Sequence, residues 1–164
     1  MSIYESLRTI FFYGKYIIIL FIVFVNMAKL TIHTDGGARG NPGPAGIGVF
    51  ITDEKGKKVK EVSEYIGKAT NNQAEYKALI RGLEEAKKSG ADEISIIMDS
   101  ELIVKQLNQE YKVKDKELGS LFVKAWNLLQ GFKDWTVKHV VRSKNKKADE
   151  LVNKTLDKQT KKTL

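Results

Sequence analysis

One stretch limits the possible folds of this chain more than any other: LTIHTDGGARGNPGPAGIGVFI, from Leu30 to Ile51. Its two ends, Leu30 to Thr34 and Ile47 to Ile51, are rich in β-forming residues and predict two strands. Asp35 stands where the first strand is expected to end. We expect the glycine-rich segment that follows to be a loop, because it is too long for a two-residue turn. Glycines leave backbone exposed beside the acid, which suits a metal ion bound to a phosphate.

Composition limits the chemistry of such a site. The 164 residues include no cysteine and two histidines, which excludes thiolate ligands and a dense histidine site. Carboxylates would therefore hold any metal, and they favour a hard ion such as Mg²⁺ or Mn²⁺. The net charge of +8 fits a polyanionic partner, although a generally lysine-rich surface would give the same value.

The first 26 residues differ from the rest, because IFFYGKYIIILFIVFV is almost wholly apolar. Its uninterrupted part, Tyr16 to Val25, has ten residues, whereas a membrane span needs roughly 20. A membrane anchor, a signal peptide and a true translation start at Met27 all remain open. We favour the start at Met27. We therefore expect an extension over 1–26, one domain over 27–164, a cytoplasmic location and no stable membrane association.

The next elements continue an antiparallel sheet and then begin a helix. Strands are predicted over Ile47–Thr52 and Val59–Ile66. Thr70 and Gln73 have the spacing of a capping box, which predicts a helix from about Asn71 to Lys88. One face of this helix is apolar, and Glu75 lies near its middle. A carboxylate that points into packing is costly unless it is paired or binds a metal, whereas most helical glutamates are simply solvated.

Two more acids follow predicted strands. The apolar run Glu93–Met98 predicts a buried strand, and Asp99-Ser100 lies at its carboxyl end, directly before a predicted helix over 101–111. Ligands of α/β sheets bind at such strand ends, although Asp99 or Ser100 could equally serve only as a helix cap. Further on, the pattern predicts a helix over Leu118–Phe132 and a strand over Trp135–Val141.

The last predicted helix begins near Ser143 and places Asp149 in its second turn, with a frayed lysine-rich tail after Leu156. An aspartate there would bind a metal or would only complement the helix dipole at the surface.

Four motifs carry these acids in order: TDGGARGNPGPAGIG, TNNQAEYKAL, MDSELIVKQL and HVVRSKNKKADEL. Together they resemble type 1 ribonuclease H, and the resemblance runs from about Lys29 to Leu156. It implies an α/β ribonuclease H-like fold with a mixed five-stranded sheet flanked by helices. Three strands of that sheet are antiparallel, two more are parallel, and the first strand is central.

The resemblance implies an endonuclease that hydrolyses the RNA strand of RNA–DNA hybrids and leaves 3′-hydroxyl and 5′-phosphate ends. It implies two Mg²⁺ ions, with Mn²⁺ as a substitute, held by Asp35, Glu75, Asp99 and Asp149. Asp35 would touch both ions. Contacts to the hybrid would come from amide, hydroxyl and backbone groups of Asn41, Asn71, Asn72, Thr70, Gly36, Gly37, Ala38 and Ser100. Those near Gly36 to Ala38 and at Ser100, together with Glu75, would detect the 2′-hydroxyls of RNA.

The chain departs from the family pattern twice. The connection between the two middle helices is only KVKDKEL, where many members carry a basic, aromatic protrusion. Many members also have a catalytic histidine in a loop before the last acid. Here His139 stands ten residues before Asp149 but within a strand pattern, and Arg142 stands seven before it. We favour Arg142 for this role, in which a cation steadies the leaving phosphate.

Three other readings are weaker. A nucleic-acid-binding module with an inactive ribonuclease H fold would have lost an acid, and none is lost. A sugar kinase-like ATPase needs two large lobes, for which the chain is too short, and no GxxxxGK[ST] motif is present. A membrane-tethered protein rests only on the first 26 residues. We expect a monomer that uses no small-molecule cofactor.

Overall fold

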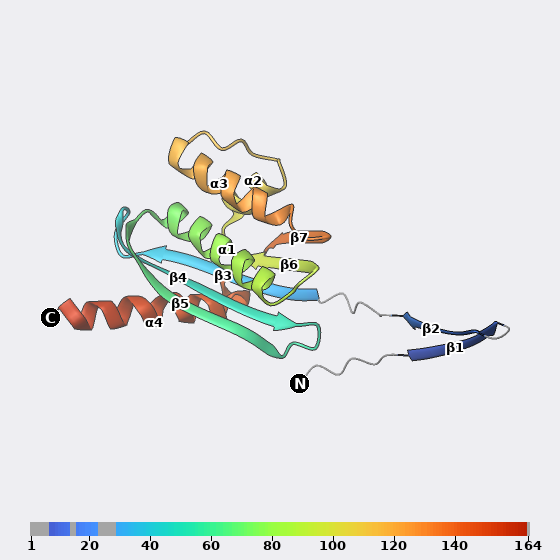
Figure 1. Cartoon of the computed structure of the whole chain (residues 1–164). Coiled ribbons are helices and arrows are strands. Elements are labelled where there is room, and N and C mark those ends of the chain that lie inside the picture. Colours follow the sequence, from blue (N-terminus) through green and yellow to red (C-terminus); the bar gives the residue numbers. More distant parts are fainter. Residues whose placement is uncertain (1–6, 14–15, 23–28, 164) are drawn as a thin grey trace.

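A computed structural model describes residues 7–13, 16–22 and 29–163 (Figure 1). Within the apolar extension, β1 (Leu7–Tyr13) and β2 (Tyr16–Ile22) pair with each other as a two-stranded antiparallel sheet. No strand of this sheet hydrogen-bonds to the main sheet. The residues joining the two sheets, 23–28, lie outside the described part, and the assignment of 1–26 to an extension stays a prediction. Among the described helices, none is long and apolar enough to cross a membrane.

The main sheet has five strands in the order β5-β4-β3-β6-β7 (Figure 1). β3, β4 and β5 are antiparallel, and β6 and β7 run parallel to β3. The strands are β3 (Lys29–Ala38), β4 (Gly43–Asp53), β5 (Lys58–Ala69), β6 (Glu93–Met98) and β7 (Asp134–His139). This confirms the predicted mixed sheet with its first strand, β3, at the centre.

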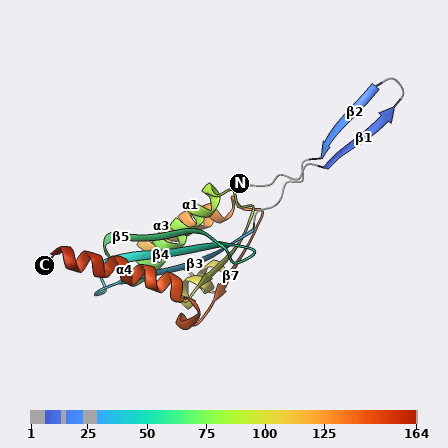
Figure 2. The same cartoon turned by 90° about the horizontal axis from the view of Figure 1, so that it is seen from below.

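Helices cover both faces of the sheet, as Figure 2 shows. They are α1 (Asn71–Lys88), α2 (Glu101–Leu107), α3 (Lys116–Leu129) and α4 (Lys146–Thr163), with a short 3₁₀ helix η1 (Arg142–Lys144) before α4. α1 packs on one face, where Gly82 lies against Ile32 and Thr34. α4 packs on the other face, where Gly48 lies under Ala148. The main core lies between β3, β4, β6, α1, α2 and α3.

The glycine-rich segment is not the long loop that we expected. β3 continues through Asp35 to Ala38, and β4 starts at Gly43, so that only residues 39–42 turn the chain. The turn contains a cis peptide bond between Asn41 and Pro42. The glycines serve close packing: a Cβ on Gly36 would lie 2.2 Å from the backbone carbon of Ala74 in α1. A glycine-rich sequence can mark such an approach as well as a loop, and spacing alone does not separate the two.

Helix α4 also begins later than predicted. Residues 142–144 form η1, and α4 starts at Lys146, so that Asp149 lies in its first turn and not in its second. The helix continues to Thr163, so the expected fraying after Leu156 is wrong. Smaller differences are boundaries: β7 ends at His139 and α2 ends at Leu107, each before the predicted end.

Candidate metal centre

Strand register brings Asp35 and Asp99 together. β6 runs parallel to β3, and the last paired residues are His33 and Ile97. Asp35 lies two residues after His33, and Asp99 lies two residues after Ile97. Both acids therefore lie side by side, just beyond the last pair that joins β3 to β6. β6 ends at Met98, and beyond it this edge of β3 has no strand partner.

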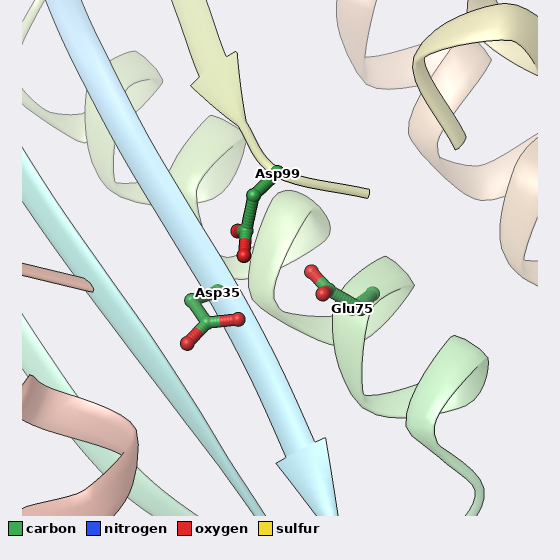
Figure 3. Close-up of side chains that lie close together, drawn as sticks. All are labelled: Asp35, Glu75 and Asp99. Atoms are coloured by element: carbon green, nitrogen blue, oxygen red, sulfur yellow. The ribbon is translucent and has the colours of Figure 1, made fainter. Parts of the chain in front are cut away.

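Glu75 reaches the same place from α1. The helix begins at a capping box in which the Thr70 hydroxyl accepts a hydrogen bond from the Gln73 N–H at 3.2 Å, which sets the position of the first turns. Because Gly36 has no side chain, the helix backbone lies directly against β3. Carboxylate oxygens of Asp35, Glu75 and Asp99 all lie within 4.8 Å of one another, and Figure 3 shows the three side chains pointing toward one another.

The protein alone leaves this negative charge poorly compensated. Burial, and then the charges of Asp99 and Asp149, raise the pKa of Asp35 to about 6. Burial, and then the charges of Asp35 and Asp99, raise the pKa of Glu75 well above its ordinary value. Oε2 of Glu75 is buried and has no hydrogen-bond partner among the described residues. Three carboxylates whose oxygens converge, one of which also has an unpartnered oxygen, suit a hard divalent cation that would compensate their charge.

Asp149 lies at the border of this cluster. Its charge raises the pKa of Asp35, but it is outside the group of three whose oxygens lie within 4.8 Å. Arg142 donates to Oδ1 of Asp149 from Nε at 3.0 Å and also from Nη2. Asn153, one turn further along α4, donates to Oδ2 of Asp149 at 3.1 Å. The fourth predicted acid is therefore held by neighbours on its own segment.

The structure separates the two candidates for the loop cation. Arg142, in η1, is in direct contact with Asp149, and its charge lowers the pKa of Asp35. His139 is exposed at the end of β7, and it is not among the charges that shift the pKa of Asp35 or Glu75. Arg142 is thus in direct contact with one of the predicted metal ligands, and its role in catalysis stays a prediction.

Hydrogen bonds at the start of α1 link three of the residues predicted to contact the hybrid, Ala38, Asn41 and Asn71. Oδ1 of Asn71 accepts from the Ala38 N–H at 2.9 Å, and Oδ1 of Asn41 accepts from the Asn71 N–H at 3.0 Å. Both asparagines therefore use their oxygen inside the protein and keep their NH₂ group for another acceptor. Asn72 is exposed, and Ser100 caps α2 without using its hydroxyl. Gly37 is half-buried in β3, whereas Gly36 is buried against α1.

Sequence reasoning missed one residue of this region, Asn145, which directly precedes α4 and is 1% exposed. An asparagine four residues before Asp149 is a possible helix cap, but Ser143 offered the same signal two residues earlier.

Comparisons with known proteins agree with this fold. A family model described as reverse transcriptase-like matches residues 33–155. "Ribonuclease HI" of Halobacterium salinarum is 47% identical over 129 residues, which are 79% of this chain and 65% of that protein. "Bifunctional protein Rv2228c" of Mycobacterium tuberculosis is 44% identical over 130 residues, which are 79% of this chain and 36% of that protein.

Among solved structures, LC11-RNase H1 in complex with an RNA/DNA hybrid is 50% identical. The match has a TM-score of 0.76 and covers 80% of this chain and 99% of that one. The fold and the acidic cluster thus define a ribonuclease H-like domain. The extent of the match shows that the chain belongs to the type 1 ribonuclease H family. The match spans about two thirds of the length of the Halobacterium salinarum protein and about a third of the length of the Mycobacterium tuberculosis protein.

Proposed function

We propose that this protein is an endonuclease that hydrolyses the RNA strand of RNA–DNA hybrids and leaves 3′-hydroxyl and 5′-phosphate ends. The observation that carries the proposal is the convergence of Asp35, Glu75 and Asp99 beside β3, just beyond the end of β6. Oε2 of Glu75 is buried there and has no hydrogen-bond partner among the described residues. Carboxylates arranged in this way suit phosphodiester chemistry, in which negative charge accumulates at the phosphate. Family membership makes the hybrid the natural substrate.

Divalent ions would be held by these three acids and by Asp149. Mg²⁺ is the proposed ion, and Mn²⁺ is its substitute, because all four ligand groups are hard oxygen donors. When bound, such ions supply a Lewis acid and lower the pKa of a nearby water. The protein's own part is to hold the carboxylates close together in a partly dry site, at the expense of their mutual repulsion.

The hybrid would bind across β3 and the first turn of α1. The NH₂ groups of Asn41 and Asn71 are oriented by their internal hydrogen bonds, and Asn72 and Thr70 continue the same surface. Backbone at Gly36, Gly37 and Ala38, with Ser100 and Glu75, would detect the RNA 2′-hydroxyls, the groups that distinguish RNA from DNA. The relative LC11-RNase H1, solved with an RNA/DNA hybrid, supports this type of ligand.

Arg142 would steady the leaving phosphate, and its contact with Asp149 supports this assignment over His139. A guanidinium beside the acids would have to release Asp149 when ions bind, and it would then be available to a phosphate oxygen. We further infer that the protein acts as a cytoplasmic monomer without a small-molecule cofactor.

The test is cleavage of an end-labelled RNA–DNA hybrid, an RNA duplex and a DNA duplex, each with Mg²⁺ and with EDTA. We expect cleavage of the hybrid only in Mg²⁺, and products that a polymerase can extend from their 3′ ends. Asp35→Asn is the matched control for a contaminating nuclease. Hybrid binding without any cleavage would instead identify a binding module, and cleavage in EDTA would exclude the metal mechanism.

A further inference from the structure

Asn145 connects the acidic cluster to the helix that carries Asp149. Its side chain is buried, and its residue directly precedes α4. Its backbone carbonyl oxygen accepts a hydrogen bond from the Asp149 N–H at 3.2 Å, which makes it part of the first turn of that helix. The orientation of Asn145 therefore sets where α4 begins.

The side-chain NH₂ group of Asn145 holds two other segments. Nδ2 donates to the backbone oxygen of Thr34 at 2.8 Å and to Oδ1 of Asp99 at 2.8 Å. An amide nitrogen carries two protons, and these two acceptors use both. Capping of a helix N-terminus requires a side-chain oxygen, so neither contact is explained by a capping role.

The Thr34 contact has a clear structural reason. The ladder between β3 and β6 stops at His33, and Thr34 is the next residue of β3. A buried carbonyl oxygen without a partner is costly, and the Asn145 amide supplies the donor that β6 no longer provides. Because the same nitrogen also holds Asp99, it ties this acid to the strand residue that precedes Asp35.

The amide oxygen of Asn145 faces β3 as well. Oδ1 is buried and makes no hydrogen bond of good geometry among the described residues. Burial lowers the pKa of His33, and an interaction of its side chain with Asn145 opposes that shift. His33 is the residue that precedes Thr34, so Asn145 interacts with two successive residues of β3 as well as with Asp99.

We propose that Asn145 is a positioning residue for the metal centre: one amide fixes Asp99 against β3 and, through the start of α4, fixes Asp149 relative to Asp35. The proposal rests on the metal-dependent hydrolysis proposed above. With Asn145 in place, the acids approach one another before any ion binds, so that binding requires little rearrangement. Residues that orient metal ligands commonly change metal affinity by about 10- to 100-fold when they are altered.

The test is Asn145→Ser, because serine can still cap α4 but is too short to reach Thr34 and Asp99. The control is Asp53→Ala, which removes two hydrogen bonds from the Lys55 and Lys57 N–H groups at the turn between β4 and β5. It is matched in the number of bonds lost but does not touch the acids. Mg²⁺ is titrated twice, by its effect on the melting temperature without substrate and by hybrid cleavage.

In Asn145→Ser we expect the half-saturating Mg²⁺ concentration to rise about ten-fold in both titrations. We expect kcat to fall while KM for the hybrid stays near the wild-type value. Asp53→Ala should lower the melting temperature in EDTA and leave the half-saturating Mg²⁺ concentration at its wild-type value. A purely structural role of Asn145 would give the behaviour of Asp53→Ala, and that result would overturn the proposal.

Should Asn145→Ser fail to fold, the wild-type protein provides a second measurement. In ¹⁵N-labelled protein, the side-chain NH₂ resonances of Asn145 should shift during a Mg²⁺ titration with the midpoint seen in thermal melting. Absence of a shift would overturn the positioning role, while hybrid cleavage by the same sample would leave the proposed function standing. Absence of Mg²⁺-dependent cleavage by the wild type would overturn the function instead.

Discussion

Asp35 is 6% exposed and lies beside other acids, and these conditions raise its pKa to about 6. An acid with a raised folded-state pKa binds more protons in the folded than in the unfolded state between about pH 4 and pH 6. The stability of the metal-free protein therefore falls as pH rises through this range. Glu75, whose pKa is also raised, acts in the same direction.

Asp35→Asn should remove this penalty and abolish hybrid cleavage. In EDTA at pH 7 we expect the variant to be as stable as the wild type or more stable, by roughly 3 kcal/mol at most for a two-unit shift. The difference should vanish near pH 4, where the wild-type carboxyl is protonated. Stabilisation by added Mg²⁺ should shrink, because it depends on affinity for the folded state.

Thermal melting from pH 4 to pH 8, with and without Mg²⁺, measures each part. Ca²⁺ should stabilise the wild type yet support little turnover, because it is larger and accepts looser coordination. Hybrid cleavage by Asp35→Asn near the wild-type rate would contradict the assignment of this acid.

Arg142→Ala should lower kcat by roughly ten- to a thousand-fold and leave hybrid binding nearly intact. The reason is the contact of its guanidinium with Asp149, which holds the cation beside the acids proposed to bind the ions. His139→Ala should have a smaller effect, because His139 stands at the exposed end of β7. Single-turnover cleavage with both variants measures this, and the opposite ranking would transfer the role to His139.

At the scale of elements, the site depends on the close approach of β3 and α1. Gly36 makes this approach possible, because a Cβ there would lie 2.2 Å from the Ala74 backbone and 2.3 Å from the Glu75 nitrogen. The elements cannot separate without moving Glu75 away from Asp35. Packing of the fold and geometry of the cluster are therefore set by the same contact.

Gly36→Ala should destabilise the protein by about 1–3 kcal/mol or more, since neither backbone can yield easily. It should also weaken the stabilisation by Mg²⁺, because Glu75 is displaced. Gly119→Ala is the matched control: no atom lies within 4 Å of its Cβ position in α3, so we expect a gain of about 0.4–1 kcal/mol. Urea unfolding measures both, and a neutral Gly36→Ala would contradict the packing argument.

At the scale of the whole molecule, substrate binding must rely on the surface of the domain itself. Residues 108–115 alone join α2 to α3, in place of the longer basic protrusion of many relatives. We therefore expect few phosphate contacts and a shallow dependence of log affinity on log salt, with a slope of about −4 or less in magnitude. Fluorescence anisotropy with labelled hybrid in Ca²⁺ measures the slope. A slope near −9 would reveal a larger binding surface.

A variant that begins at Met27 should cleave the hybrid and melt like the full chain. β1 and β2 pair only with each other, and the main sheet starts at Lys29. The control is the full chain, purified and assayed in the same way. Loss of solubility or activity in the shorter variant would show that 1–26 belongs to the domain.

Local patterns were sufficient for much of the fold. The capping box and the apolar spacing predicted α1 at its observed bounds, because both signals lie within a few turns of one helix. The run Glu93–Met98 was likewise correct as a strand. The prediction of a long loop over the glycine-rich segment was wrong. Gly36 is needed because the backbone of Ala74, 38 residues further along the chain, packs against it. The predicted start of α4 near Ser143 was wrong, because Ser143 and Asn145 are both residue types that cap helices and the sequence does not choose between them.

From its residues alone the chain revealed which acids to consider and in what order, since each stands in a motif with its own local signature. It did not reveal their geometry. Asp35 and Asp99 lie side by side because of the register between β3 and β6. Glu75 lies close to them because α1 packs directly against Gly36. Sequence spacing already favoured Arg142, whereas the role proposed for Asn145 depends on its contacts with Thr34 and Asp99, which are distant in sequence. Such contacts arise only when the core closes, because no local pattern encodes the distance between two elements.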